Sequence, residues 1–131
     1  MHITYESDYA IRIVKTLAMK NTRVDAKTIA EATGVTLRFS LKILRKLVMA
    51  NIAKSYKGTQ GGYVLARDPS QITLREVIEA IEGEYALSRC LTNSDFCNCP
   101  RDADSGLCQF KDTFSKISNM VKEELDKVSF A

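Results

Sequence analysis

The sequence predicts a mainly α-helical protein that carries one small β-hairpin and a long C-terminal helix. Apolar residues recur every three to four positions over most of the 131 residues, which is the period of an α-helix. The pattern changes only between residues 52 and 67, where two short strand-like runs flank a glycine-rich turn. The chain is long enough for one domain and an appendage, and its 45% hydrophobic and 27% charged residues are typical of a soluble globular protein.

The first predicted helix spans residues 8–20, with Ser7 as its N-cap. Its apolar residues follow helical spacing: Ala10, Ile13, Val14, Leu17 and Ala18. We expect this face to be buried.

Two further helices follow in close succession. Asp25 can cap a short helix over residues 26–33, which Gly34 would end in the left-handed conformation. Thr36 can then cap a helix over residues 37–50. The buried stripe predicted for that helix consists of Leu37, Leu41, Leu44, Leu47 and Val48.

The strand-like runs at 52–57 and 63–67 predict a hairpin whose turn holds Gly58, Gly61 and Gly62. Two helices joined at a glycine and followed by a basic hairpin are typical of a winged helix-turn-helix domain. A plain hairpin that covers the edge of the core is the alternative. We assign the winged helix-turn-helix domain to residues 1–83.

After the hairpin comes a capping box, in which Thr73 and Glu76 start a helix that ends at Gly83. A cysteine-rich loop over residues 84–106 separates it from a predicted dimerisation helix at 107–131. That helix carries a near-heptad apolar stripe: Leu107, Phe110, Phe114, Ile117, Val121, Leu125 and Val128. Packing within one chain explains part of the stripe, but pairing with a second chain is the favoured interpretation.

Charge is distributed unevenly along the chain. Residues 36–67 carry seven basic and no acidic side chains, whereas the other 99 residues carry 12 basic and 16 acidic ones, a net of −4. A basic island of this kind predicts binding to a polyanion such as DNA, and a solvated basic surface is the alternative. We predict DNA contacts from the third helix and the hairpin: Thr36, Arg38, Phe39, Ser40, Lys42, Lys57, Gly58, Gln60 and Gly61. Lys54 and Arg67 are also expected to reach phosphates.

The four cysteines fall within 19 residues, at Cys90, Cys97, Cys99 and Cys108. The sequence shows neither a membrane-spanning apolar run nor the layout of a signal peptide, so we expect a cytoplasmic protein with reduced thiols. Clustered thiols there indicate an iron–sulphur cluster, a thiol switch or zinc. An enzyme is not expected: the sole histidine is His2, and no paired acids, phosphate loop or nucleophile elbow accompany it.

Several segments together resemble one family of bacterial regulators. They are SDYAIRIVKTLA, IAEATGVTLRFSLKILRKLVMANI, KGTQGGYVLARDPSQITLREVIEAIEG and the cysteine loop, and they resemble the IscR, NsrR and CymR regulators of the Rrf2 superfamily. The resemblance implies a homodimeric repressor with crossed C-terminal helices, a recognition helix in the major groove of operator DNA and a wing in the minor groove. This chain has Lys57 where relatives commonly have Arg, Phe39 where they have Tyr, and Leu41 near a common Glu.

The resemblance also implies an iron–sulphur cluster, of the 2Fe-2S or 4Fe-4S type, held by three cysteines and a fourth ligand. Cys90 and Cys108 match the outer ligands, and either Cys97 or Cys99 is the middle one. IscR-type proteins use a histidine where this chain has Lys111, whereas NsrR-type proteins use an aspartate of the partner subunit that matches Asp8. A fourth thiolate is the rival to Asp8. A cluster-free regulator, switched by thiol oxidation or by a protein partner as in CymR, remains the alternative function.

Overall fold

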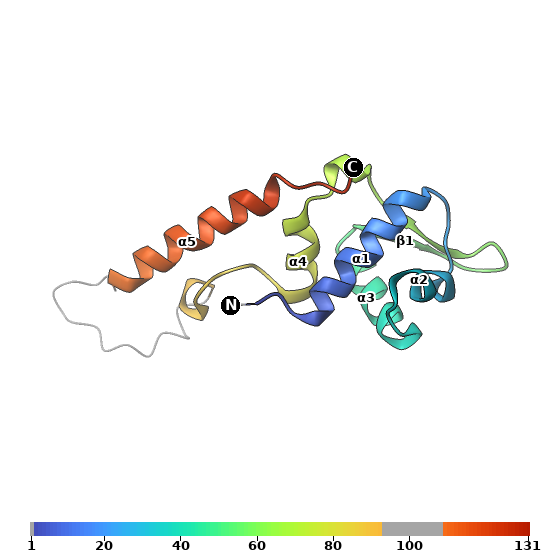
Figure 1. Cartoon of the computed structure of the whole chain (residues 1–131), viewed down its shortest axis with the longest axis horizontal. Coiled ribbons are helices and arrows are strands. Elements are labelled where there is room, and N and C mark those ends of the chain that lie inside the picture. Colours follow the sequence, from blue (N-terminus) through green and yellow to red (C-terminus); the bar gives the residue numbers. More distant parts are fainter. Residues whose placement is uncertain (1, 93–108) are drawn as a thin grey trace.

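The computed structural model describes residues 2–92 and 109–131 and shows a mainly helical chain with one two-stranded sheet (Figure 1). The elements in chain order are α1 (Tyr5–Lys20), α2 (Ala26–Thr33), α3 (Leu37–Met49), β1 (Ala53–Tyr56), β2 (Gly62–Leu65), η1 (Pro69–Gln71), α4 (Leu74–Glu82), η2 (Arg89–Leu91) and α5 (Gln109–Asp126). Helices α1 to α3 and the hairpin lie together, α4 stands beside them, and α5 extends away on the far side of α4 (Figure 1). The predicted fold class is confirmed. Among the described residues, no helix is both long and apolar enough to cross a membrane.

One apolar core joins α1 to α4 and the hairpin. Its fully buried large side chains come from every one of the first three helices and from the segments that follow them: Ile13, Leu17, Ile29, Ile43, Leu44, Leu47, Ile52, Ile72 and Val77. At about 1.5–3 kcal/mol for each side chain of this size, this burial is the main force that holds the helix-turn-helix unit to α4.

The start of α1 differs from the prediction. Thr4, not Ser7, is the N-cap, and its side-chain oxygen accepts a hydrogen bond from the Ser7 backbone N–H at 3.1 Å. Ser7 lies in the first turn, is fully buried, and its hydroxyl donates to Glu82 at the end of α4. The hydroxyls of Thr4 and Ser7 can both cap a helix. Because Thr4 caps α1, the hydroxyl of Ser7 is available to bond Glu82 of α4.

The other predicted caps are confirmed. The side chains of Asp25 and Thr36 accept from backbone N–H groups of α2 and α3, and Thr73 and Glu76 form the capping box of α4. Gly34 ends α2 with φ of 73°, a conformation that glycine adopts without steric cost. The corner between α2 and α3 is therefore fixed by local sequence.

The buried face of α3 is rotated from the predicted one. Ser40, Ile43, Leu44 and Leu47 are buried, whereas Leu37 and Leu41 are 46% and 44% exposed. The sequence of α3 contains two overlapping stripes with helical spacing. The prediction places the stripe that is richer in leucine in the core, whereas the structure buries the other one. The helix instead buries the stripe that contains Ser40, whose small side chain leaves room for the core.

The hairpin consists of two strands, and a third segment pairs with β2. β1 and β2 are antiparallel, with Ala53 opposite Leu65 and Tyr56 opposite Gly62. Val24, in the link between α1 and α2, exchanges two backbone hydrogen bonds with Tyr63, at 2.9 and 2.8 Å. A Cβ atom on Gly62 would lie 2.8 Å from the Val24 carbonyl oxygen, so only glycine fits this close approach.

The C-terminal end of α5 and the residues just after it contact the start of α4. The backbone N–H of Leu74 donates to Val128 at 2.8 Å, and that of Phe130 donates to Ile72 at 3.3 Å. Arg75 of α4 forms an ion pair with Asp126 at 2.8 Å. Of the predicted stripe, Leu107 lies outside the described residues, and Val128 lies two residues beyond the end of α5.

Candidate nucleic-acid interface

The outward face of α3 is basic and apolar. Arg38, Phe39 and Lys42 are exposed, as predicted, and Thr36 at the N-cap is exposed with its oxygen bonded to the Phe39 N–H at 3.3 Å. Ser40 is fully buried, and its hydroxyl has no hydrogen-bond partner among the described residues. This differs from the prediction, which placed Ser40 among the contacting residues, and it follows from the rotation of α3.

The hairpin presents its tip to solvent. Lys57, Gly58 and Gln60 are exposed, and the Gly61 N–H donates to the Gly58 carbonyl at 3.0 Å to close the turn. A Cβ atom on Gly61 would lie 2.7 Å from the Tyr56 carbonyl oxygen, so the turn requires glycine there. Because Gly58 and Gly61 carry no side chains, the backbone of the tip can approach a ligand closely at these two positions.

Arg67 has a structural role that the sequence analysis did not anticipate. Its guanidinium donates to the carbonyls of Asn51 at 3.3 Å and Gln71 at 3.1 Å and pairs with Glu76 at 3.2 Å. These contacts join the ends of α3 and the hairpin to α4. Arg67 therefore lies in the framework, and the expectation that it reaches phosphates is not supported by its position.

Arg23 is a residue that the sequence analysis missed. Its guanidinium stacks over the ring of Tyr56 at 3.7 Å, and it donates to the Gln60 carbonyl at 3.2 Å. The second bond spans 37 residues, and Arg23 lies outside the basic island, so neither spacing nor charge indicated this contact. Together with the Val24–Tyr63 bridge, Arg23 holds both strands of the hairpin against the α1–α2 link.

An aromatic cluster lies where α1 meets the start of α3. The Phe39 ring lies 6.5 Å from that of Tyr9, which in turn stacks on Tyr5 at 6.4 Å. Arg12 lies over the outer part of the cluster, 5.7 Å from the Tyr9 ring centroid. Glu6, in the same turn of α1, is the acidic partner of Lys42 and Lys46 of α3.

Of the cysteines, only Cys90 lies among the described residues. It is half-buried on η2, and its Sγ lies 3.2 Å from Ser88 Oγ. Cys97, Cys99 and Cys108 fall outside the described residues. Within residues 2–92 and 109–131, no three His, Cys, Asp or Glu side chains gather as metal ligands would. Asp8 is 41% exposed at its side chain and pairs with Arg12 at 2.7 Å.

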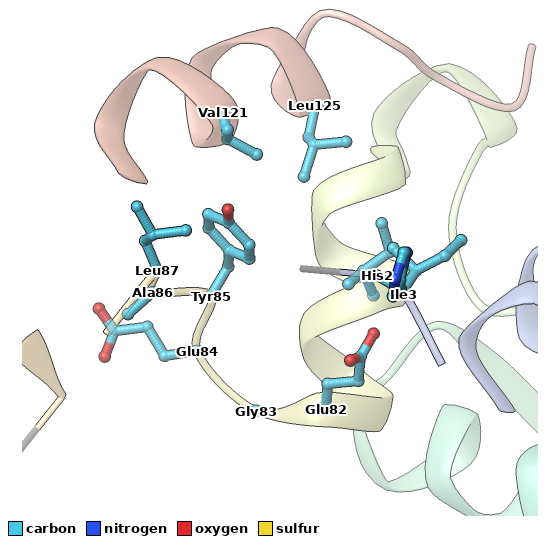
Figure 2. A pocket seen from close by; sticks show the side chains of 11 residues that line it. His2, Ile3, Glu82, Gly83, Glu84, Tyr85, Ala86, Leu87, Val121 and Leu125 are labelled. Carbon is cyan, nitrogen blue, oxygen red and sulfur yellow. The ribbon is translucent and has the colours of Figure 1, made fainter. Parts of the chain in front are cut away.

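A cavity of about 460 Å³ lies between α5, α4 and the segment that follows α4 (Figure 2). Val121 and Leu125 of α5 point into it from one side, and Tyr85 and Leu87 face them from the segment after α4. Ser118 holds that segment to α5, because its buried hydroxyl accepts from the Leu87 N–H at 2.9 Å. The cavity thus lies between the winged body, α5 and the segment that leads to Cys90.

A helix-turn-helix corner, a recognition helix with a basic outer face and a braced hairpin define a winged-helix transcriptional regulator. The comparison with known families agrees. Residues 3–131 match the model of the Rrf2 family, described as an iron-dependent transcriptional regulator, and the chain belongs to this family. It is a transcriptional regulator and not an enzyme, as expected.

Relatives and solved structures extend over almost the whole chain. The regulator NsrR of Bacillus licheniformis is 27% identical over 97% of this chain and 87% of its own length. The regulator IscR of Aliivibrio salmonicida is 29% identical over 98% and 83%. The structures of T. potens IscR and of CymR, the global cysteine regulator of B. subtilis, each superpose on 99% of this chain with a TM-score of 0.76 and 23% identity, covering 83% and 93% of those chains.

Proposed function

We propose that this protein is a homodimeric repressor that binds operator DNA through α3 and the hairpin, with an iron–sulphur cluster on its cysteine segment controlling that binding. The observation that carries the DNA-binding part is the exposure of basic side chains on both elements. Arg38, Lys42 and Lys57 are all exposed, and α3 and the hairpin lie together at the end of the molecule opposite α5 (Figure 1). This arrangement suits a helix in the major groove and a wing tip against the adjacent backbone or minor groove.

Dimerisation is supported by apolar side chains of α5 that the rest of the chain leaves uncovered. Three large apolar side chains there remain exposed in the single chain: Phe110 at 61%, Ile117 at 38% and Met120 at 56%. A row of this kind on a helix that stands away from the body favours pairing with a second copy. Met120 is more than half exposed, whereas Val121 lines the cavity of its own chain.

The cluster is supported by the donor set. Thiolates suit iron–sulphur clusters, and Cys90 and Cys108 are the proposed outer ligands, with Cys97 or Cys99 between them. Asp8 of the partner subunit is the proposed fourth ligand. Its ion pair with Arg12 is solvent-exposed and thus weak, so the carboxylate is free to exchange partners. A bound cluster would supply sensitivity to oxidants and to iron supply.

A cluster-free regulator is the second candidate. The fold is compatible with it, because CymR, including an oxidised form from Staphylococcus aureus with a TM-score of 0.72, shares the fold of this chain as IscR does. Protein prepared without oxygen separates the two. Visible absorption with bound iron and sulphide, lost in Cys90→Ser, supports the cluster. Colourless protein whose DNA affinity changes with thiol oxidation supports the alternative.

DNA binding is tested by selecting duplexes from a random library with the purified protein. We expect enrichment of an inverted repeat, and we expect Lys57→Ala to lower affinity for all duplexes while reducing the salt slope by about one unit. Lys116→Ala is the matched control, because it removes the same charge from an exposed site on α5. Failure to enrich any duplex, or equal effects of the two variants, would contradict the proposal.

A further inference from the structure

The first two turns of α3 expose three apolar side chains within five residues. Leu37, Phe39 and Leu41 are 46%, 49% and 44% exposed, and they alternate with Arg38 and buried Ser40. None of the three is required to close the core, because α3 packs through Ser40, Ile43, Leu44 and Leu47. Single exposed apolar residues are ordinary, but here Leu37 and Leu41 lie on one flank of the exposed Arg38 and Lys42 and Phe39 lies on the other, so apolar groups border the basic face of α3 on both sides.

The Phe39 ring is held in place rather than free to turn away. One side of it packs against Tyr9 at 6.5 Å and an interplanar angle of 59°, and Tyr9 is itself stacked on Tyr5. The remaining half of the side chain faces solvent. A ring fixed in this way presents a rigid apolar edge at the start of α3.

The chemistry of the major groove identifies what such an edge can contact. Among the four bases, only thymine carries an apolar group there, the C5-methyl. The side chains that read adenine or cytosine by hydrogen bonds, Asn, Gln, Asp and Glu, are absent from residues 36–42. The hydroxyl of Thr36 already accepts the Phe39 N–H, and Ser40 is buried.

We infer that α3 reads the C5-methyl groups of thymine, with Phe39 as the principal contact on one side of the basic row and Leu37 and Leu41 on the other side. This inference rests on the proposed DNA-binding function and assigns the class of sequence that α3 selects. Arg38 and Lys42 supply the contacts to guanine or phosphate that accompany it. The expected operator is therefore rich in thymine at the positions that α3 covers.

Replacement of thymine by deoxyuridine tests the inference, because this change removes only the methyl group. In the duplex enriched by library selection, each thymine of the half-site is replaced in turn. We expect affinity to fall about fourfold at one or more positions, which is the effect of one buried methyl group. In Phe39→Ala the thymine and uracil duplexes should bind alike, whereas Met49→Ala should retain the difference. Met49 is the matched control, since it is 80% exposed at the other end of α3.

The outcomes are distinct. A duplex that is enriched but insensitive to uracil at every position overturns the inference and leaves DNA binding standing. If the preference for thymine over uracil persists in Phe39→Ala, Leu37→Ala and Leu41→Ala, other residues contact the methyl groups, and this result also overturns the inference. Absence of any enriched duplex instead defeats the proposed function.

Discussion

The carboxylate of Glu6 in α1 lies 2.9 Å from Lys46 Nζ and 3.6 Å from Lys42 Nζ in α3, so one acid joins two lysines of the recognition helix. The hydrogen bond from Lys46 is the largest cause that lowers the pKa of Glu6 below its ordinary value of 4.5. Glu6 thus holds the two ammonium groups near α1 and partly neutralises the basic face.

Replacing Glu6 with Gln should strengthen binding to DNA of any sequence. Loss of the carboxylate frees Lys42 and Lys46 for phosphates, so we expect a several-fold gain in affinity for unrelated duplexes and a steeper dependence on salt. Fluorescence anisotropy over a series of salt concentrations measures both. Glu31→Gln, an exposed site on α2, is the charge-matched control. A salt slope identical in the two variants would contradict the role given to Glu6.

The same ion pairs predict a pH dependence of stability. A carboxyl with a lowered pKa in the folded state stabilises the protein above its unfolded pKa, and this contribution is lost as pH falls through the folded pKa. Near neutral pH, the free energy of unfolding of the wild type should exceed that of Glu6→Gln by up to about 1 kcal/mol, which is the contribution of a partly exposed ion pair. Urea unfolding at several pH values below about 5 should show this difference shrinking. A difference that grows towards acid pH would show that Glu6 acts otherwise.

Arg23→Lys should loosen the hairpin without changing its charge. Lysine keeps the cation but loses the planar stack on Tyr56 and the fixed geometry of the bond to Gln60. We expect faster hydrogen exchange of the Gly61 amide and a several-fold loss of operator affinity with an unchanged salt slope. Arg89→Lys, exposed on η2, is the control. Unaltered exchange at Gly61 would show that the Val24–Tyr63 bridge suffices to hold the wing.

Ser40→Ala should keep or raise stability, by up to about 1 kcal/mol, and leave DNA affinity unchanged. The variant removes a buried hydroxyl that has no partner among the described residues and adds helix propensity. Thr33→Ala is the contrasting variant, because the Thr33 hydroxyl donates to the Ile29 carbonyl at 2.7 Å; its loss should destabilise. Weakened DNA binding in Ser40→Ala with normal stability would restore Ser40 to the contact surface.

Met120→Glu should dissociate the proposed dimer without unfolding the chain. The side chain is 56% exposed in the single chain, so a carboxylate there is tolerated until a second helix covers it. Analytical ultracentrifugation should show monomer, with helical content unchanged by circular dichroism. Asn119→Glu, away from the exposed apolar row, should remain dimeric. Persistence of the dimer in Met120→Glu would place the contact on another surface.

Local signals made much of this fold predictable. Caps at Asp25, Thr36 and Thr73 and the glycines of the hairpin act within a few residues, so the sequence indicates them directly. The rotation of α3 was not predictable in the same way, because two apolar stripes overlap and tertiary packing selects between them. The contacts of Arg23 with Gln60 and of Glu6 with Lys46 were not predictable either, because the partners lie 37 and 40 residues apart in the sequence.

The attachment of residues 126–130 to the first turn of α4 makes α5 a lever with its pivot at the C-terminal end of the chain. An 18-residue helix is about 27 Å long, so a tilt of about 10° at the pivot displaces its far end by about 5 Å. Deleting the last five residues would remove the backbone hydrogen bonds of Val128 and Phe130 at the pivot, while leaving every residue of α5 and the ion pair between Arg75 and Asp126 in place.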